Sequence, residues 1–315
     1  MSAKKAEQQL KDAEKFCKEG EKAFKGGFFS KPDFPDAGSN FNKAADIFLQ
    51  NKQFELAKKY FEKSGISYDK GMILQKSGSM YAQAAQAAFF MNEAPEVERL
   101  LLEAKMRYLE GNQALQAIRQ LREMAEKAKQ TLPALAYTLY EHALDLVEQD
   151  NQYHWEKDSF IDFALLALEM DKYPEVYKAW DRAAKAFLVL KNYDSAAHCI
   201  VSQIVLHLKK GDIVAAERLF DDSMQNDFFI RTDDFSMIDM IIRGVKSHDG
   251  DLLEIGQKNV INQFLKPEIS RIIFSFKAPK STPVPKEGNQ KPAPRVEKTE
   301  EEETAEKDEE EEWIL

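Results

Sequence analysis

A short phrase that recurs at a fixed interval constrains the fold of this chain more than any other sequence feature. In each of two copies, turn-forming residues precede a large apolar residue, Tyr193 in one copy and Ile213 in the other. These two residues lie twenty positions apart, and each is followed by alanine three positions on and by an apolar residue, Ile200 or Phe220, seven positions on. Positions i, i+3 and i+7 share one face of a helix. The phrase therefore marks a helix start, and its regular recurrence is typical of a helical repeat array.

Further copies of the phrase begin at Asn51 and Asp171, and weaker copies begin at Asn92 and Gly111. Helices of about 17 residues, each about 25 Å long and joined by short turns, must pack antiparallel to their neighbours. A helix pair then repeats about every forty residues, and each pair buries its apolar face only against the next. The sequence therefore predicts an all-α, tetratricopeptide-like antiparallel solenoid over residues 1–226.

The phrase stops after residue 226. Residues 227–277 still have helical patterns, but these are shorter and more apolar, so we expect a small C-terminal helical bundle that caps the array. Residues 278–315 are first rich in Lys and Pro and then acidic, and we expect a flexible, disordered tail because such a segment cannot bury enough apolar surface to fold alone.

Net charge is concentrated in this tail. The segment from Glu297 to Glu312 holds eleven acids and two lysines, a net charge of −9 out of the −10 of the whole chain. A nearly neutral body with a polyanionic end argues against a nucleic-acid partner, because binding to phosphates requires a basic surface.

Several absences favour a cytosolic protein. No apolar run approaches the roughly 20 residues that span a bilayer, and the first ten residues lack the apolar core of a secretory signal. The two cysteines, Cys17 and Cys199, have no metal or redox spacing, so we expect free thiols in a reducing compartment.

The sequence contains no phosphate-binding loop, no dinucleotide-binding glycine motif and no zinc-protease motif. His198 and His207 are nine positions apart, which places them on opposite faces of a helix, so they cannot share a metal ion. We therefore expect no enzyme activity, no cofactor and no metal, and predict a scaffold that binds other proteins.

The loop after the first predicted helix carries three phenylalanines, Phe28, Phe29 and Phe34, with Lys25 and Lys31 close by. One interpretation is that the rings fold back onto the first repeat. The other is an exposed apolar tip that enters an anionic membrane, where it adds to a contact that already holds the protein there.

The acidic tail ends in a bulky apolar tripeptide. One interpretation is a solubilising segment; the interpretation we favour is a docking peptide for a basic groove with a hydrophobic pocket. The proposed docking residues are Glu309, Glu310, Glu311, Glu312, Trp313, Ile314 and Leu315.

Basic residues of the array also allow two interpretations. They belong either to solvated helix faces interleaved with acids, or to a basic stripe on one face that holds an acidic, rod-like partner. The candidates for such a stripe are Lys105, Arg107, Arg119, Arg122, Arg182 and Lys185.

Three segments carry a family resemblance: Lys210-Gly-Asp-Ile-Val-Ala-Ala-Glu-Arg218, Phe41-Asn-Lys-Ala-Ala-Asp-Ile-Phe48 and Met106-Arg-Tyr-Leu-Glu-Gly-Asn112. With them the chain resembles, over nearly its whole length, the soluble NSF attachment proteins (SNAPs), and the gamma type looks closest; NSF is the N-ethylmaleimide-sensitive fusion ATPase. The resemblance implies a twisted sheet of antiparallel helices with a C-terminal bundle.

The resemblance also implies a function in vesicle-mediated transport, such as ER–Golgi transport. The chain would bind assembled SNARE four-helix bundles of the syntaxin type and recruit the hexameric NSF AAA+ ATPase that takes them apart for further membrane fusion. Phe28 and Phe29 would lie in the membrane-binding loop, the acidic C-terminus would engage the ATPase, and the protein would be peripheral on the cytosolic face of membranes.

Two features depart from the family pattern: the longer tail with its Trp-Ile-Leu end, and acidic residues near Asp158 and Asp162, where basic SNARE-facing residues are expected. The alternative function is a helical-repeat scaffold subunit of a stable multiprotein complex, of the proteasome-lid or signalosome type, with no membrane role.

Overall fold

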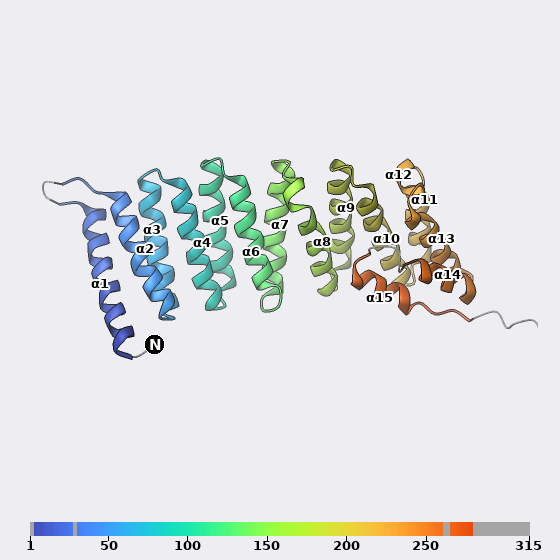
Figure 1. Ribbon diagram of the computed structural model, residues 1–315, viewed down its shortest axis with the longest axis horizontal. Helices are drawn as coiled ribbons and strands as arrows, with labels where there is room; N and C mark the ends of the chain where they lie inside the picture. The colour runs from blue at the N-terminus through green and yellow to red at the C-terminus, as the bar shows by residue number, and fades with distance from the viewer. Residues whose placement is uncertain (1–2, 28–29, 261–264, 280–315) are drawn as a thin grey trace, which may run out of the picture. The chain divides into compact units, whose positions relative to one another are not determined.

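The computed structural model describes residues 3–27, 30–260 and 265–279, and within them all regular structure is helical (Figure 1). The residues up to Pro279 form one compact unit, and Lys280–Leu315 lie outside the described residues. The helices are α1 (Ala3–Lys25), α2 (Phe34–Gln50), α3 (Phe54–Lys70), α4 (Leu74–Phe90), α5 (Ala94–Glu110), α6 (Ala114–Ala128), α7 (Pro133–Gln149), α8 (Tyr153–Glu169), α9 (Tyr173–Val189), α10 (Tyr193–Lys209), α11 (Ile213–Ser223), α12 (Asp227–Ile230), α13 (Asp233–Lys246), α14 (Gly250–Val260) and α15 (Pro267–Ser275). The fold class predicted from the sequence, a tetratricopeptide-like antiparallel solenoid, is confirmed.

The twenty-residue period has a simple structural origin. Among the described helices, α2 to α5 and α7 to α10 are each 17 residues long, and three-residue turns join most of them. The middle residue of each such turn has a left-handed backbone, with φ between 53° and 75°. These turn-tip residues are Lys52, Met72, Asn92, Asn112, Asn151, Asp171, Lys191 and Gly211.

Backbone hydrogen bonds close these turns in the same way. In the α2–α3 turn, the N–H of Gln53 donates to the carbonyl of Phe48, five residues back, at 2.9 Å, and the Gln53 carbonyl then accepts the first helical bond from Ala57 at 2.9 Å. This is the Schellman ending of a helix, and its last residue is also the N-cap of the next helix. One residue serves both helices, so the turn needs only three residues.

One turn breaks the period. Helix α6 has 15 residues, its C-cap Lys129 keeps a right-handed backbone, and the N–H of Leu132 donates to the carbonyl of Ala128 at 2.8 Å. The next turn tip, Asn151, therefore lies 39 positions after Asn112 rather than at twice the period.

Consecutive helices run antiparallel, and each packs mainly on its neighbours in the chain. From α1 to α10, the turns that follow odd-numbered helices therefore lie along one edge of the compact unit, the upper edge in Figure 1, together with the connection between α1 and α2. The turns that follow even-numbered helices of this array lie along the opposite edge.

Ion pairs tie together alternate helices of the array. Lys63 of α3 pairs with Glu21 of α1, and Arg99 of α5 pairs with Glu62 of α3 at 2.6 Å. Such pairs cross from one repeat to the next, so they add to the apolar packing between repeats.

The C-terminal helices close the array over α10. Residues 201–206 of α10 are all buried, because α9, α11, α12, α13 and α15 all contact this helix. Helix α12 begins at Asp227, the first residue after the predicted array.

Candidate functional site

Two of the six basic candidates bridge odd-numbered helices. The Nε atom of Arg107, on α5, lies 2.8 Å from the carboxylate of Asp69 on α3. Arg182, on α9, contacts two carboxylates of α7, those of Asp145 at 2.9 Å and Glu148 at 2.8 Å. Both guanidinium groups are therefore committed to contacts between repeats.

A third candidate, Arg122, lies on α6 and pairs with Glu156 of α8 at 3.0 Å. Glu156 is buried and also accepts a hydrogen bond from the Ser159 hydroxyl at 3.0 Å. Its backbone leaves the helical region (φ −124°, ψ 16°), so α8 is kinked where the pair forms. This pair links even-numbered helices.

The other three candidates, Lys105, Arg119 and Lys185, have no ion pair with any described residue, and Arg119 and Lys185 are exposed. The six residues lie on α5, α6 and α9. Of the three paired ones, Arg107 and Arg182 contact odd-numbered helices, whereas Arg122 contacts an even-numbered helix. Their contact with a SNARE bundle stays a prediction, and Lys105, Arg119 and Lys185 are the members whose charges are free to make it.

The base of the phenylalanine loop is well defined. The N–H of Asp33 donates to the carbonyl of Ala23 at 2.9 Å, and the Asp33 carboxylate accepts from the N–H of Asp36 at 3.0 Å, which caps α2. Phe34 is half-buried, and its ring packs edge-on against Phe24 with 5.5 Å between centroids. Phe34 thus lies on the first repeat, whereas Phe28 and Phe29 lie outside the described residues.

The proposed ATPase-docking residues, Glu309 to Leu315, also lie outside the described residues. Their role stays a prediction.

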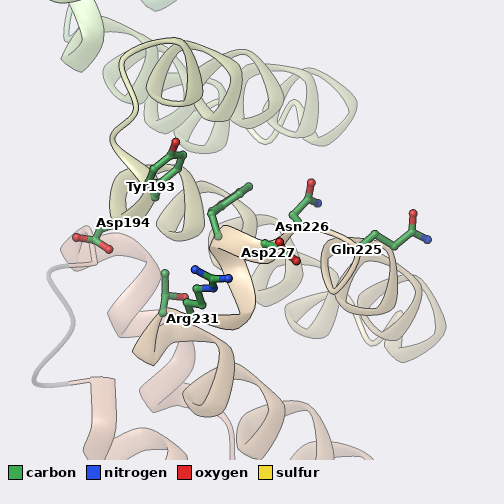
Figure 2. Close-up of a pocket in the computed structure, with 8 residues that line it drawn as sticks. Tyr193, Asp194, Gln225, Asn226, Asp227 and Arg231 are labelled. Carbon is green, nitrogen blue, oxygen red and sulfur yellow. The ribbon is translucent and has the colours of Figure 1, made fainter.

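A hollow of about 700 Å³ lies where the array meets the C-terminal helices (Figure 2). Tyr193 and Asp194 contribute from the start of α10, and Asp227 and Arg231 from α12 and the residue after it. The ring of Tyr193 stacks with that of Phe228 at 5.7 Å. Its lining is mixed, because these two rings lie beside the charged side chains of Asp194, Asp227 and Arg231.

A buried acid–base pair joins α10 to α13. Nε2 of His198 lies 3.3 Å from Oδ2 of Asp234, whose side chain is only 2% exposed. Burial, and then the charges of Asp194 and Asp233, raise the pKa of Asp234 to about 7. Burial also lowers the pKa of His198, so both shifts favour the neutral carboxyl and the neutral imidazole over their charged forms.

Neither Asp234 nor the turn at Met72 was identified from the sequence. The α3–α4 turn has no Asn, Asp or Gly at its tip, although Gly71 precedes it, and Asp234 lies outside the repeating phrase.

The described residues contain no cluster of three or more His, Cys, Asp or Glu placed to hold a metal ion. None of the described helices is both long enough and apolar enough to cross a membrane. Stacked antiparallel helix pairs with charged surfaces define a helical-repeat protein of the tetratricopeptide-like class.

Comparison with known families identifies the member of that class. The family model of the soluble NSF attachment protein, SNAP, matches residues 4–257, and the chain belongs to this family. A gamma-soluble NSF attachment protein of Dictyostelium discoideum is 25% identical over 275 residues, which cover 86% of this chain and 84% of that protein. One of Arabidopsis thaliana is 24% identical over 230 residues, covering 71% and 76%.

Among solved structures, BtubC (BKLC) from P. vanneervenii is similar with a TM-score of 0.36 and 12% identity, over 71% of this chain and 91% of that chain.

Proposed function

We propose that this chain is an adaptor that binds assembled SNARE four-helix bundles and brings the hexameric NSF ATPase to them for disassembly in vesicle transport. The observation that carries the proposal is the family match over residues 4–257, which spans nearly all of the compact helical unit. The names of the two gamma-type relatives support the same function. In this function the chain positions its partners, and the ATPase supplies the energy.

Contact with the SNARE bundle would be electrostatic. The unpaired side chains of Lys105, Arg119 and Lys185 would face acidic groups of the rod, and salt would weaken the contact because exposed charges are screened within about 8–10 Å. Phe28 and Phe29 would contact the membrane from its cytosolic side. The acidic tail and its apolar end would contact the ATPase.

The decisive experiment measures NSF ATPase stimulation and SNARE disassembly with the full chain and with a chain that lacks Trp313–Leu315. We expect both activities with the full chain and a loss of about tenfold or more after the cut. A control variant changes Glu309–Glu312 to Gln and keeps the apolar end. It distinguishes the contribution of the acidic charges from that of the apolar tripeptide.

Binding to SNARE bundles is tested by reversing the charges of Lys105, Arg119 and Lys185 to Glu. We expect about tenfold weaker binding at low salt. The same change of charge at three exposed lysines elsewhere, Lys5, Lys18 and Lys277, should have a smaller effect. A scaffold of a stable complex would neither bind the bundle nor stimulate the ATPase, and that result would contradict the proposal.

A further inference from the structure

Met72 stands out among the turn tips of the array. Its φ is 57°, in the left-handed region, and the residue is 79% exposed. The other turn tips in the described residues are Asn, Asp, Lys or Gly. A left-handed backbone is costly for a residue with a Cβ, and Asn and Asp offset part of that cost by local hydrogen bonds. Methionine has no such compensation, and neither have Lys52 and Lys191 at the same position of their turns. Met72 differs from these lysines because its exposed side chain is apolar.

The residues around Met72 form a firm platform. The α3–α4 turn lies against the start of α2, because a Cβ built on Gly71 would lie 3.4 Å from the ring of Pro35. The ammonium of Lys70 lies 5.4 Å from the ring centroid of Phe24 and 5.6 Å from that of Phe34. Met72 therefore projects from a turn that is packed on the first repeat.

Basic side chains lie on both sides of Met72 in the chain. Lys70 and Lys76 flank it; both are exposed, and neither forms an ion pair with another described residue. The neighbouring acid, Asp69, is held by Arg107 at 2.8 Å. The two ammonium groups lie over aromatic rings, Lys70 over Phe24 and Phe34 and Lys76 over Tyr68. Neither charge is neutralised by a carboxylate of the described residues, so both remain available to an external anion.

We propose that the α3–α4 turn is a membrane-contact site, in which Met72 enters the interface of an anionic bilayer and Lys70 and Lys76 contact lipid headgroups. A single apolar side chain on a projecting turn fits a partner that it can penetrate, whereas a protein partner would need a pocket for it. Lysines beside an apolar tip favour an anionic surface. The inference rests on the proposed function because both require the chain to work at a membrane.

One methionine and two lysines bind weakly alone. Their contribution depends on a second contact that holds the protein near the bilayer, which raises the effective concentration of the turn at the surface. The site lies on the edge that also carries the connection between α1 and α2 (Figure 1). The same edge would therefore face the membrane in both contacts.

The test is co-sedimentation of the full chain with vesicles that contain 30% phosphatidylserine and with vesicles of phosphatidylcholine alone. We expect Met72→Asn to weaken binding to the anionic vesicles about fivefold to tenfold, and Lys70→Gln with Lys76→Gln to remove most of its dependence on the anionic lipid. Asn is favoured in the left-handed region, so Met72→Asn should unfold at the same or a higher temperature, which excludes misfolding as the cause.

Val214 provides a matched control, since it is 77% exposed and lies at the start of α11, after a turn of the opposite edge. Val214→Gln should bind anionic vesicles as the unchanged chain does. Equal losses from Met72→Asn and Val214→Gln would overturn the inference, because they would show unspecific adsorption.

Two outcomes separate this inference from the proposed function. If Met72→Asn binds vesicles normally while Phe28→Ser with Phe29→Ser does not, the inference is wrong and the membrane loop stands. If no variant changes vesicle binding, or the unchanged chain binds no vesicles, the inference is again wrong, while SNARE disassembly and ATPase stimulation still decide whether the adaptor function holds.

Discussion

At the scale of single residues, the turn tips show how little of the repeat depends on any one side chain. Lys191 and Gly211 occupy the same position in consecutive turns, with φ of 56° and 75°. The hydrogen bonds that close both turns come from the backbone. The side chain at the tip therefore affects stability mainly through the strain of its own left-handed backbone.

This strain predicts opposite effects for two substitutions. Lys191→Gly should raise the free energy of unfolding by about 1 kcal/mol, because glycine has no Cβ to strain. Gly211→Ala should lower it by a similar amount, since a Cβ there meets no other atom within 4 Å and only the backbone is strained. Urea unfolding measures both changes, and equal signs would contradict the explanation.

The Asp234 carboxyl should make stability depend on pH. Its pKa is raised from 3.8 to about 7, so the folded chain keeps a proton that the unfolded chain has lost, and stability falls as pH rises through this range. Asp234→Asn removes this dependence. The groups that face the carboxyl, His198, Asp194 and Asp233, remain in the variant.

We compare the free energy of unfolding of Asp234→Asn with that of the unchanged chain at each pH. We expect this difference to shift in favour of the variant by about 2 kcal/mol between pH 5.5 and pH 8. Urea unfolding at both pH values measures the difference. A difference that stays constant with pH would show that the Asp234 carboxyl is ionised in the folded state across this range.

Some of these positions could be predicted from the sequence, and others could not for a physical reason. The copies at Asn92, Gly111 and Asp171 contain residues that favour turns, and turns lie there. Methionine does not favour turns, so Met72 gave no signal in the sequence. It is tolerated at the turn tip because backbone hydrogen bonds close the turn whatever the tip residue is. The contact of His198 with Asp234 depends on how α13 packs on α10, and no local pattern records that packing.

At the scale of helices, close packing in the first repeats depends on glycine. A Cβ on Gly38 would lie 2.9 Å from the ring of Tyr68, and one on Gly65 would lie 3.0 Å from the ring of Tyr81. In each case an aromatic ring of a later helix fills the space that the glycine leaves. Which ring meets which glycine could not be predicted from the period.

Gly38→Ala should therefore destabilise the chain although alanine favours helices. Alanine gains about 1 kcal/mol in helix propensity, whereas overpacking a filled contact costs about 1–3 kcal/mol, and here the neighbour is a 6% exposed ring. Tyr68→Leu in the same chain should recover part of the loss. The measurement is a double-mutant cycle of unfolding free energies, and additive losses would show that the ring is not the cause.

The two irregular elements were not predictable from the phrase. The α6–α7 turn uses right-handed backbone at Lys129, so no left-handed tip marks it. The kink in α8 arises at Glu156, whose buried carboxylate pairs with Arg122 from two helices earlier. Both features depend on contacts between helices rather than on spacing along the chain.

At the scale of the whole chain, α10 holds the array and the C-terminal helices together. The array alone would leave one side of α10 without cover, because α13 and α15 both contact this helix. A helix that is apolar on every side needs cover on every side. The C-terminal helices are therefore part of the same folding unit as the array.

This dependence predicts unequal effects of two truncations. A chain that ends at Pro279 keeps every described helix, so we expect it to unfold within about 2 °C of the full chain. A chain that ends at Ser223 loses α12 to α15 and exposes the apolar side of α10, whose residues, each buried, contribute about 1.5–3 kcal/mol. It should aggregate or unfold at least 10 °C lower. Thermal unfolding followed by circular dichroism compares the three chains, and a stable, monomeric chain ending at Ser223 would show that the array folds independently of the helices that cover α10.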